Sequence, residues 1–114
     1  MSMKLTTREV GGVSIVDLSG KITLGEGGVA LRDEVRKLVA AGKKKIVLNL
    51  AEVNYIDSSG LGELVSAYTA VKNAGGELKL LSLTSKVRDL LVITKLVTVF
   101  DVKDDEASAV SSFA

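Results

Sequence analysis

Five consecutive residues, Ile46-Val47-Leu48-Asn49-Leu50, are almost all apolar and lie between two stretches of helical periodicity. A strand covered by helices on both faces has this nearly continuous apolar pattern, whereas a half-exposed strand alternates. The run therefore predicts the central strand of a sheet over residues 46–50.

Glycine pairs and apolar spacing place the other elements around this strand. Two runs rich in Thr, Val and Ile, residues 4–10 and 13–19, are separated by Gly11-Gly12, which is a strong hairpin signal. Apolar residues then recur at helical spacing in two segments, one before Gly42 and one before Gly75-Gly76. We predict two amphipathic helices there, with the segment 51–62 joining the central strand to the second of them.

The last third of the chain continues the alternation of strands and helices. We predict a strand over 77–83, a helix over 85–93 capped by Ser85, a strand over 97–102 and a C-terminal helix whose first turn carries residues 104–106. The resulting order, β-β-α-β-α-β-α-β-α, predicts one α/β domain over residues 1–114. Its mixed sheet has about five strands, an antiparallel N-terminal hairpin and about four helices.

The composition excludes several classes of function. The chain has no His, no Cys and a formal net charge of +1. Without imidazole or thiolate, the common catalytic triads and transition-metal sites cannot form, so we expect neither an enzyme nor a metal or other cofactor. The charge balance argues against a nucleic-acid partner. Short apolar runs and a polar start over residues 1–12 predict a cytoplasmic protein without a membrane segment.

In open α/β sheets, functional loops gather at the carboxyl ends of the strands, which here are residues 20–28 and 54–62. The second loop enters a helix through an acid, two serines and two glycines, in the order Asp57-Ser58-Ser59-Gly60-Leu61-Gly62. Free backbone N–H groups and the positive end of the helix dipole would stabilise an added phosphate there. Simple helix capping by the acid or a serine is the alternative.

This motif, at the expected distance after residues 46–50 and before Gly75-Gly76, resembles the signature of STAS-domain anti-sigma factor antagonists. The order of the elements and the length resemble that family over essentially the whole chain. The resemblance implies that a serine-kinase anti-sigma factor binds the protein and phosphorylates Ser58. It further implies that binding releases a sigma factor, that phosphorylation of Ser58 switches binding off, and that a serine phosphatase reverses it.

The resemblance also implies roles for the neighbours of Ser58. We expect Ser59 to cap the helix and Asp57 either to cap it or to orient the Ser58 hydroxyl. We expect Gly60, Leu61 and Gly62 to shape the partner-binding surface. In the loop of residues 19–28, Thr23 stands where the family usually has an Asp, so this loop bears on which kinase is recognised.

Other interpretations of the same residues stay open. The lone STAS domain also resembles the small subunit of lipid-transport ABC systems, which acts as a structural or interaction module. A hydrolase using Ser58 would need a base within reach, and no lysine stands at a compelling spacing. The loop of residues 19–28 fits neither the Walker A nor the dinucleotide fingerprint. The apolar stretch 87–100 favours packing in the core, and a groove that binds a partner is the alternative. We expect a monomer.

Overall fold

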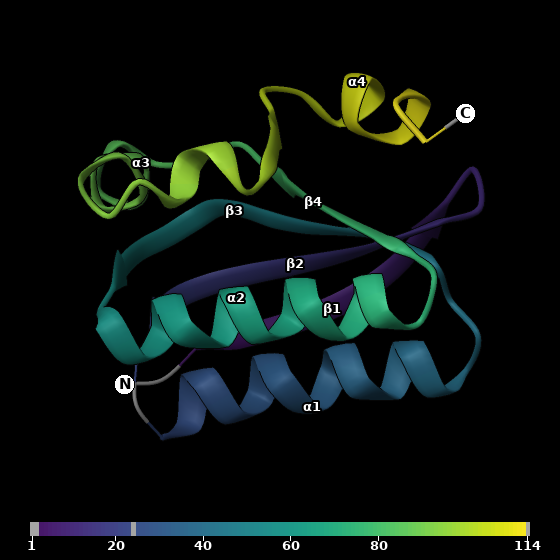
Figure 1. The fold of residues 1–114 in the computed structure, drawn as a ribbon, viewed down its shortest axis with the longest axis horizontal. Helices are drawn as coiled ribbons and strands as arrows, with labels where there is room; N and C mark the ends of the chain where they lie inside the picture. Colours follow the sequence, from purple (N-terminus) through teal and green to yellow (C-terminus); the bar gives the residue numbers. More distant parts are fainter. Residues whose placement is uncertain (1–2, 24, 114) are drawn as a thin grey trace.

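The computed structural model describes residues 3–23 and 25–113, which form one five-stranded sheet flanked by helices (Figure 1). The strands follow the chain order across the sheet. The first pair is antiparallel and the other pairs are parallel, which confirms the predicted mixed α/β class. The strands are β1 (Lys4–Val10), β2 (Val13–Ile22), β3 (Lys45–Ile56), β4 (Glu77–Leu81) and β5 (Asp101–Lys103).

Helices lie on both faces of this sheet. Figure 1 shows α1 and α2 side by side on one face and the shorter α3 and α4 on the other. A 3-10 turn, η1, follows α3. The bounds are α1 (Glu26–Ala40), α2 (Ser58–Asn73), α3 (Ser85–Ile93), η1 (Leu96–Thr98) and α4 (Glu106–Ser111).

The predicted hairpin and central strand are both confirmed. Gly11 and Gly12 have φ angles of 56° and 81°, the left-handed values that a tight two-residue hairpin turn requires. In the run 46–50, even-numbered side chains pack into the main core against α1 and α2. Val47 enters a smaller core beneath α4 with Ile15 and Leu81. Burial on both faces explains why the run is almost entirely apolar.

Two strands run further than predicted. β2 continues from residue 19 to Ile22, and β3 continues through the segment 51–56 that was expected to be a connection. The register between these strands shifts after Asp17, because a bulge in β3 turns Ala51 and Glu52 outward. The bulge breaks the apolar pattern although the backbone stays paired, so sequence periodicity could not show this part of the strand.

The prediction of a strand over 97–102 is wrong for most of its length. The chain forms η1 there, and only Asp101–Lys103 pairs with β4. Phe100 is buried in the main core, with its ring centroid 5.5 Å from that of Tyr68 in an edge-to-face contact. This packing diverts the segment from the sheet edge despite its β-branched residues. Thr84 caps α3 instead of Ser85, because Thr84 has the extended backbone of an N-cap and its hydroxyl oxygen accepts from the Val87 N–H. The same hydroxyl donates to the Val53 carbonyl at 2.9 Å.

Candidate functional site

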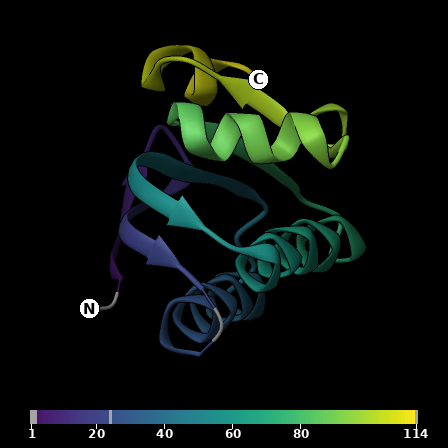
Figure 2. The same cartoon turned by 90° about the vertical axis from the view of Figure 1, so that its left-hand side faces the viewer.

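The ends of β2 and β3 bring the two predicted functional loops together. Ile22 and Ile56 are register partners, and the chain leaves them to enter α1 and α2 respectively. Figure 2 looks onto this end, where the arrowheads of β2 and β3 point at the starts of the two helices. The Asp57 N–H donates to the Ile22 carbonyl at 3.4 Å, so the two loops touch through backbone. We call this end of the sheet the Ser58 surface; it comprises Thr23 and Asp57–Gly62.

Asp57 is the N-cap of α2. Its backbone is extended, its Oδ1 accepts a 2.8 Å hydrogen bond from the Gly60 N–H, and its carbonyl accepts from the Leu61 N–H at 2.9 Å. The side-chain contact satisfies one of the N–H groups that a helix start leaves without partners, and the carbonyl contact is the first hydrogen bond of the helix itself. Of the two roles that the sequence left open for Asp57, the structure shows capping.

Ser58 is the first residue of α2 and its side chain is exposed. Within the residues that the structure describes, its hydroxyl makes no hydrogen bond, because Asp57 already supplies the cap. The hydroxyl therefore stands free at the positive end of the helix dipole, where added negative charge is favoured.

The expectation that Ser59 caps the helix is wrong. Ser59 is the second residue of α2 and is exposed, and the capping oxygen belongs to Asp57. A serine inside the first turn cannot act as N-cap, because that residue must have extended backbone geometry. Ser58 and Ser59 thus present two neighbouring exposed hydroxyls.

Gly60 and Gly62 differ in what surrounds them. Gly60 is buried, and a Cβ there would overlap the carbonyl oxygen of Ile22, so only glycine lets α2 begin this close to β2. A Cβ on Gly62 would have no atom within 4 Å. Between them, Leu61 is 6% exposed and packs into the main core. Gly60 and Leu61 therefore position the start of α2, and Gly62 faces outward.

Thr23 follows β2 in the loop that leads to α1, and it is half-buried. Its carbonyl accepts from the Gly28 N–H at 3.0 Å. A Cβ on Gly27 would lie 2.5 Å from the Lys21 carbonyl, so the start of α1 also packs closely on the end of β2. Gly27 thus serves packing, whereas Gly25 has open space around it and a φ of 95°, a difference that sequence inspection did not show. Leu24, which belongs to the same loop, lies outside the described residues.

Two residues beside the Ser58 surface were not predicted as part of it. Lys21 and Tyr55 are register partners on β2 and β3, and the Lys21 ammonium lies 6.0 Å from the centre of the Tyr55 ring. Tyr55 is 45% exposed because its neighbour Ile56 points into the core. Strand alternation at Tyr55-Ile56 would have indicated this outward position, had β3 been extended that far.

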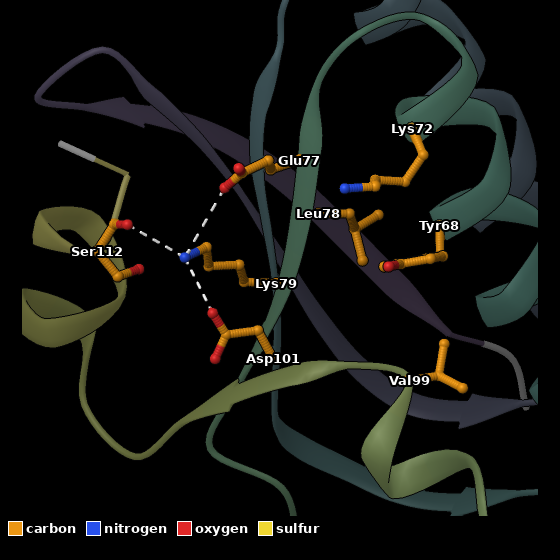
Figure 3. Close-up of a pocket in the computed structure, with 8 residues that line it drawn as sticks. All are labelled: Tyr68, Lys72, Glu77, Leu78, Lys79, Val99, Asp101 and Ser112. Carbon is orange, nitrogen blue, oxygen red and sulfur yellow. Dashed lines mark hydrogen bonds and ion pairs between the residues drawn. The ribbon is translucent and has the colours of Figure 1, made fainter.

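A cavity of about 330 Å³, here called the Lys79 cavity, lies at the opposite end of the sheet, beside the start of β4 (Figure 3). Lys79, only 8% exposed, donates to the Ser112 carbonyl at 3.2 Å and lies 3.0 Å from the Asp101 carboxylate. Its ammonium also lies 4.7 Å from the centre of the Phe113 ring. These contacts hold the C-terminal residues against β4, so the paired charges of this cavity have a structural role.

Metal-ligating side chains do not gather in groups of three or more among residues 3–23 and 25–113. None of the helices described in that part of the chain is long and apolar enough to cross a membrane. The fold and the Ser58 surface define a small α/β domain that presents an exposed serine hydroxyl at a helix start.

Comparison with known proteins agrees with this description of a small α/β domain. The STAS domain family matches residues 4–109. The anti-sigma-B factor antagonist of Bacillus subtilis is 34% identical over 76% of this chain and 78% of its own length. The anti-sigma F factor antagonist of Paenibacillus polymyxa is 26% identical over 97% and 95%.

Among solved structures, the Bacillus cell fate determinant SpoIIAA in its phosphorylated form has a TM-score of 0.75 over 97% of this chain and 100% of its own. Its sequence identity of 16% supports the shared fold alone. The chain belongs to the STAS domain family, and its curated relatives are anti-sigma factor antagonists, which are regulatory binding proteins.

Proposed function

We propose that this chain is an anti-sigma factor antagonist whose binding is switched off by phosphorylation of Ser58. The observation that carries the proposal is the exposed Ser58 hydroxyl at the start of α2, which makes no hydrogen bond within the described residues while Asp57 makes the cap. In this proposal residues 1–114 act as one STAS domain, as a cytoplasmic monomer. The names of the relatives support the type of partner, an anti-sigma factor.

The partner supplies ATP and the catalytic groups, and this chain supplies the acceptor. The Ser58 oxygen attacks the γ-phosphorus of ATP held by the kinase, an O–P bond forms, and the bond to ADP breaks. The hydroxyl proton goes to a base on the kinase. The composition supports this division, since the chain has no His and no Cys to supply proton transfer or metal binding near neutral pH.

The other residues of the Ser58 surface have supporting roles in this proposal. Asp57, Gly60 and Leu61 position the first turn of α2, the first by its cap and the others by packing. Ser59, Gly62 and Thr23 form the surface around the acceptor that the kinase contacts. Because Thr23 stands in the loop that touches Asp57 through Ile22, it influences which kinase is accepted.

Phosphorylation of Ser58 would weaken binding because the Ser58 surface could no longer pack against the kinase without desolvating the phosphate. A phosphoserine carries about −1.5 to −2 charge at pH 7, which must be desolvated if it is packed against the kinase. A penalty of about 3–4 kcal/mol corresponds to a loss of a few hundredfold in affinity. A serine phosphatase that removes this phosphate restores binding.

The test is phosphorylation by the serine-kinase anti-sigma factor that co-purifies with the unphosphorylated protein. We expect one phosphate on the wild type at Ser58, mapped by mass spectrometry, and none on Ser58→Ala. Ser59→Ala is the matched control, because it removes the neighbouring exposed hydroxyl and should leave phosphorylation intact. Ser58→Asp should bind the kinase a few hundredfold more weakly.

Phosphate that appears only at other positions would contradict the proposal, as would unchanged binding by Ser58→Asp. Co-purification of transporter subunits in place of a kinase would instead favour the role of a STAS module in a lipid-transport system.

A further inference from the structure

Exposed apolar side chains lie beside the Ser58 surface, at the end of β3 and on α3. Ile93, the last residue of α3, is 76% exposed, and Tyr55 is 45% exposed. Large apolar side chains that are clustered and exposed mark sites of protein–protein contact more often than single ones do. Tyr55 is also separated from Ser58 by only two residues.

Between these side chains lies a cavity of about 320 Å³, here called the α3 cavity. The helix positions explain its shape, since Val87 and Leu91 turn into the core and leave Leu90 and Ile93 on the flank toward β3. Its lining residues are Tyr55, Ile56, Lys86, Asp89, Leu90 and Ile93.

Lys86 and Asp89 give the lining of the α3 cavity one charge of each sign, and Lys21 beside Tyr55 adds a second positive charge nearby. The Lys21 ammonium lies 6.0 Å from the centre of the Tyr55 ring. Asp89 is the one acidic group among its lining residues. An apolar side chain with a neighbouring carboxylate would therefore fit both the apolar wall and the lysines.

We propose that the α3 cavity receives an apolar side chain, flanked by an acidic residue, from the surface of the same anti-sigma factor that phosphorylates Ser58. This inference rests on the proposed function and adds a second contact to it. The kinase then has one contact at the α3 cavity, which phosphorylation leaves chemically unchanged, and a second contact at Ser58, which phosphorylation changes. The α3 cavity then contributes affinity and partner choice, and Ser58 contributes the switch.

The first test compares Ile93→Ser with Val92→Ser in calorimetric titrations against the purified kinase. Val92 is the neighbouring residue on α3, is 54% exposed, and does not line the cavity. Truncation of an interface anchor commonly weakens binding about tenfold or more. We expect that loss for Ile93→Ser and less than a twofold change for Val92→Ser. Val99→Ser, 40% exposed beside the Lys79 cavity at the other end, is a second control.

Two further measurements separate anchoring from structural damage. Ile93→Ser should raise KM for phosphorylation of Ser58 about tenfold and leave kcat unchanged, because the acceptor itself is not altered. Lys86→Glu should weaken binding and reduce its dependence on salt, because it removes a charge that attracts the partner. Thermal melts should show all variants folded.

The outcomes distinguish the two proposals. Equal affinity of Ile93→Ser, Val92→Ser and wild type would overturn the α3 cavity as an anchor and leave the Ser58 switch standing. A wild-type chain that neither binds the kinase nor receives phosphate would overturn both. A loss of binding in Lys86→Glu alone would contradict the apolar anchor.

Discussion

At the scale of single residues, the two glycines at the start of α2, Gly60 and Gly62, have different effects on the structure. Gly60 allows the helix to begin against the Ile22 carbonyl, where any Cβ would overlap. Gly62 has open space around its Cα and contributes only backbone freedom. A sequence shows both simply as glycine, and the contact with a residue nearly forty positions earlier distinguishes them.

The pair gives a direct prediction for stability. Gly62→Ala should raise the free energy of unfolding by about 0.5–1 kcal/mol, because alanine loses less backbone entropy in a helix. Gly60→Ala should lower it by about 1–3 kcal/mol, because the helix start must move away from β2. Urea denaturation of both variants measures these changes, and equal midpoints for the two would contradict the assignment.

Asp57 is tested in the same way. Asp57→Ala should cost about 0.5–2 kcal/mol in unfolding free energy, because the Gly60 N–H loses its capping acceptor. Asp57→Asn keeps a capping oxygen and should lose much less, and Ser59→Ala should change almost nothing. A Ser59→Ala variant as destabilised as Asp57→Ala would restore Ser59 as the cap.

At the scale of elements, α4 is held to the sheet by both apolar and ionic contacts. Ala109 packs into the small core beneath it, and Glu106 receives a 2.6 Å hydrogen bond from Arg8 on β1. Arg8 also donates two hydrogen bonds to Asp17, at 2.6 and 3.2 Å. The C-terminal helix, the hairpin and the sheet are thus joined through one guanidinium.

This network predicts an acid-sensitive stability. Hydrogen bonds from Arg8 are the main reason why the pKa values of Asp17 and Glu106 are lowered. A hydrogen bond from Lys79 is the main reason why the pKa of Asp101 is lowered. Carboxylates with lowered pKa values stabilise the fold above their unfolded values, about pH 4, and lose that contribution as pH falls through the folded values. The melting temperature should therefore fall as the pH is lowered below about 4.

Arg8→Gln should reduce the stability at neutral pH by up to about 1 kcal/mol, since the ion pairs are partly exposed. It should also flatten the fall of the melting temperature in acid, because Asp17 and Glu106 then titrate closer to their unfolded values. Arg88→Gln is the matched control, since Arg88 lies 3.7 Å from the exposed Asp104. The same acid slope in Arg8→Gln and wild type would contradict the role of this network.

At the scale of the whole molecule, the fold and the proposed switch are nearly independent. Ser58 is exposed, and its hydroxyl has no hydrogen bond within the described part of the chain, so a phosphate there displaces no packed side chain. The formal net charge of +1 would become about −0.5 to −1, with the new charge concentrated at the helix start.

The phosphorylated protein should therefore keep its fold while it loses its partner. We expect the unfolding free energy to change by less than about 1 kcal/mol, since the dipole at the helix start favours the phosphate. Hydrogen exchange should differ only near residues 57–62. Widespread loss of protection, or a drop in melting temperature of many degrees, would show that phosphorylation acts by unfolding the domain.

Local patterns in the sequence were sufficient for the element order, the Gly11-Gly12 hairpin, the buried run 46–50 and the Ser58 motif at a helix start. Each of these depends on residues close together in the chain, through turn chemistry, apolar spacing and burial on both faces. The tertiary structure decided what depends on distant residues. Examples are the overlap that requires Gly60, the cap by Thr84, the continuation of β3 past its bulge, and the diversion of residues 96–100 by the packing of Phe100. The α3 cavity belongs to this second group, because only the folded chain brings Tyr55 and Ile93 together.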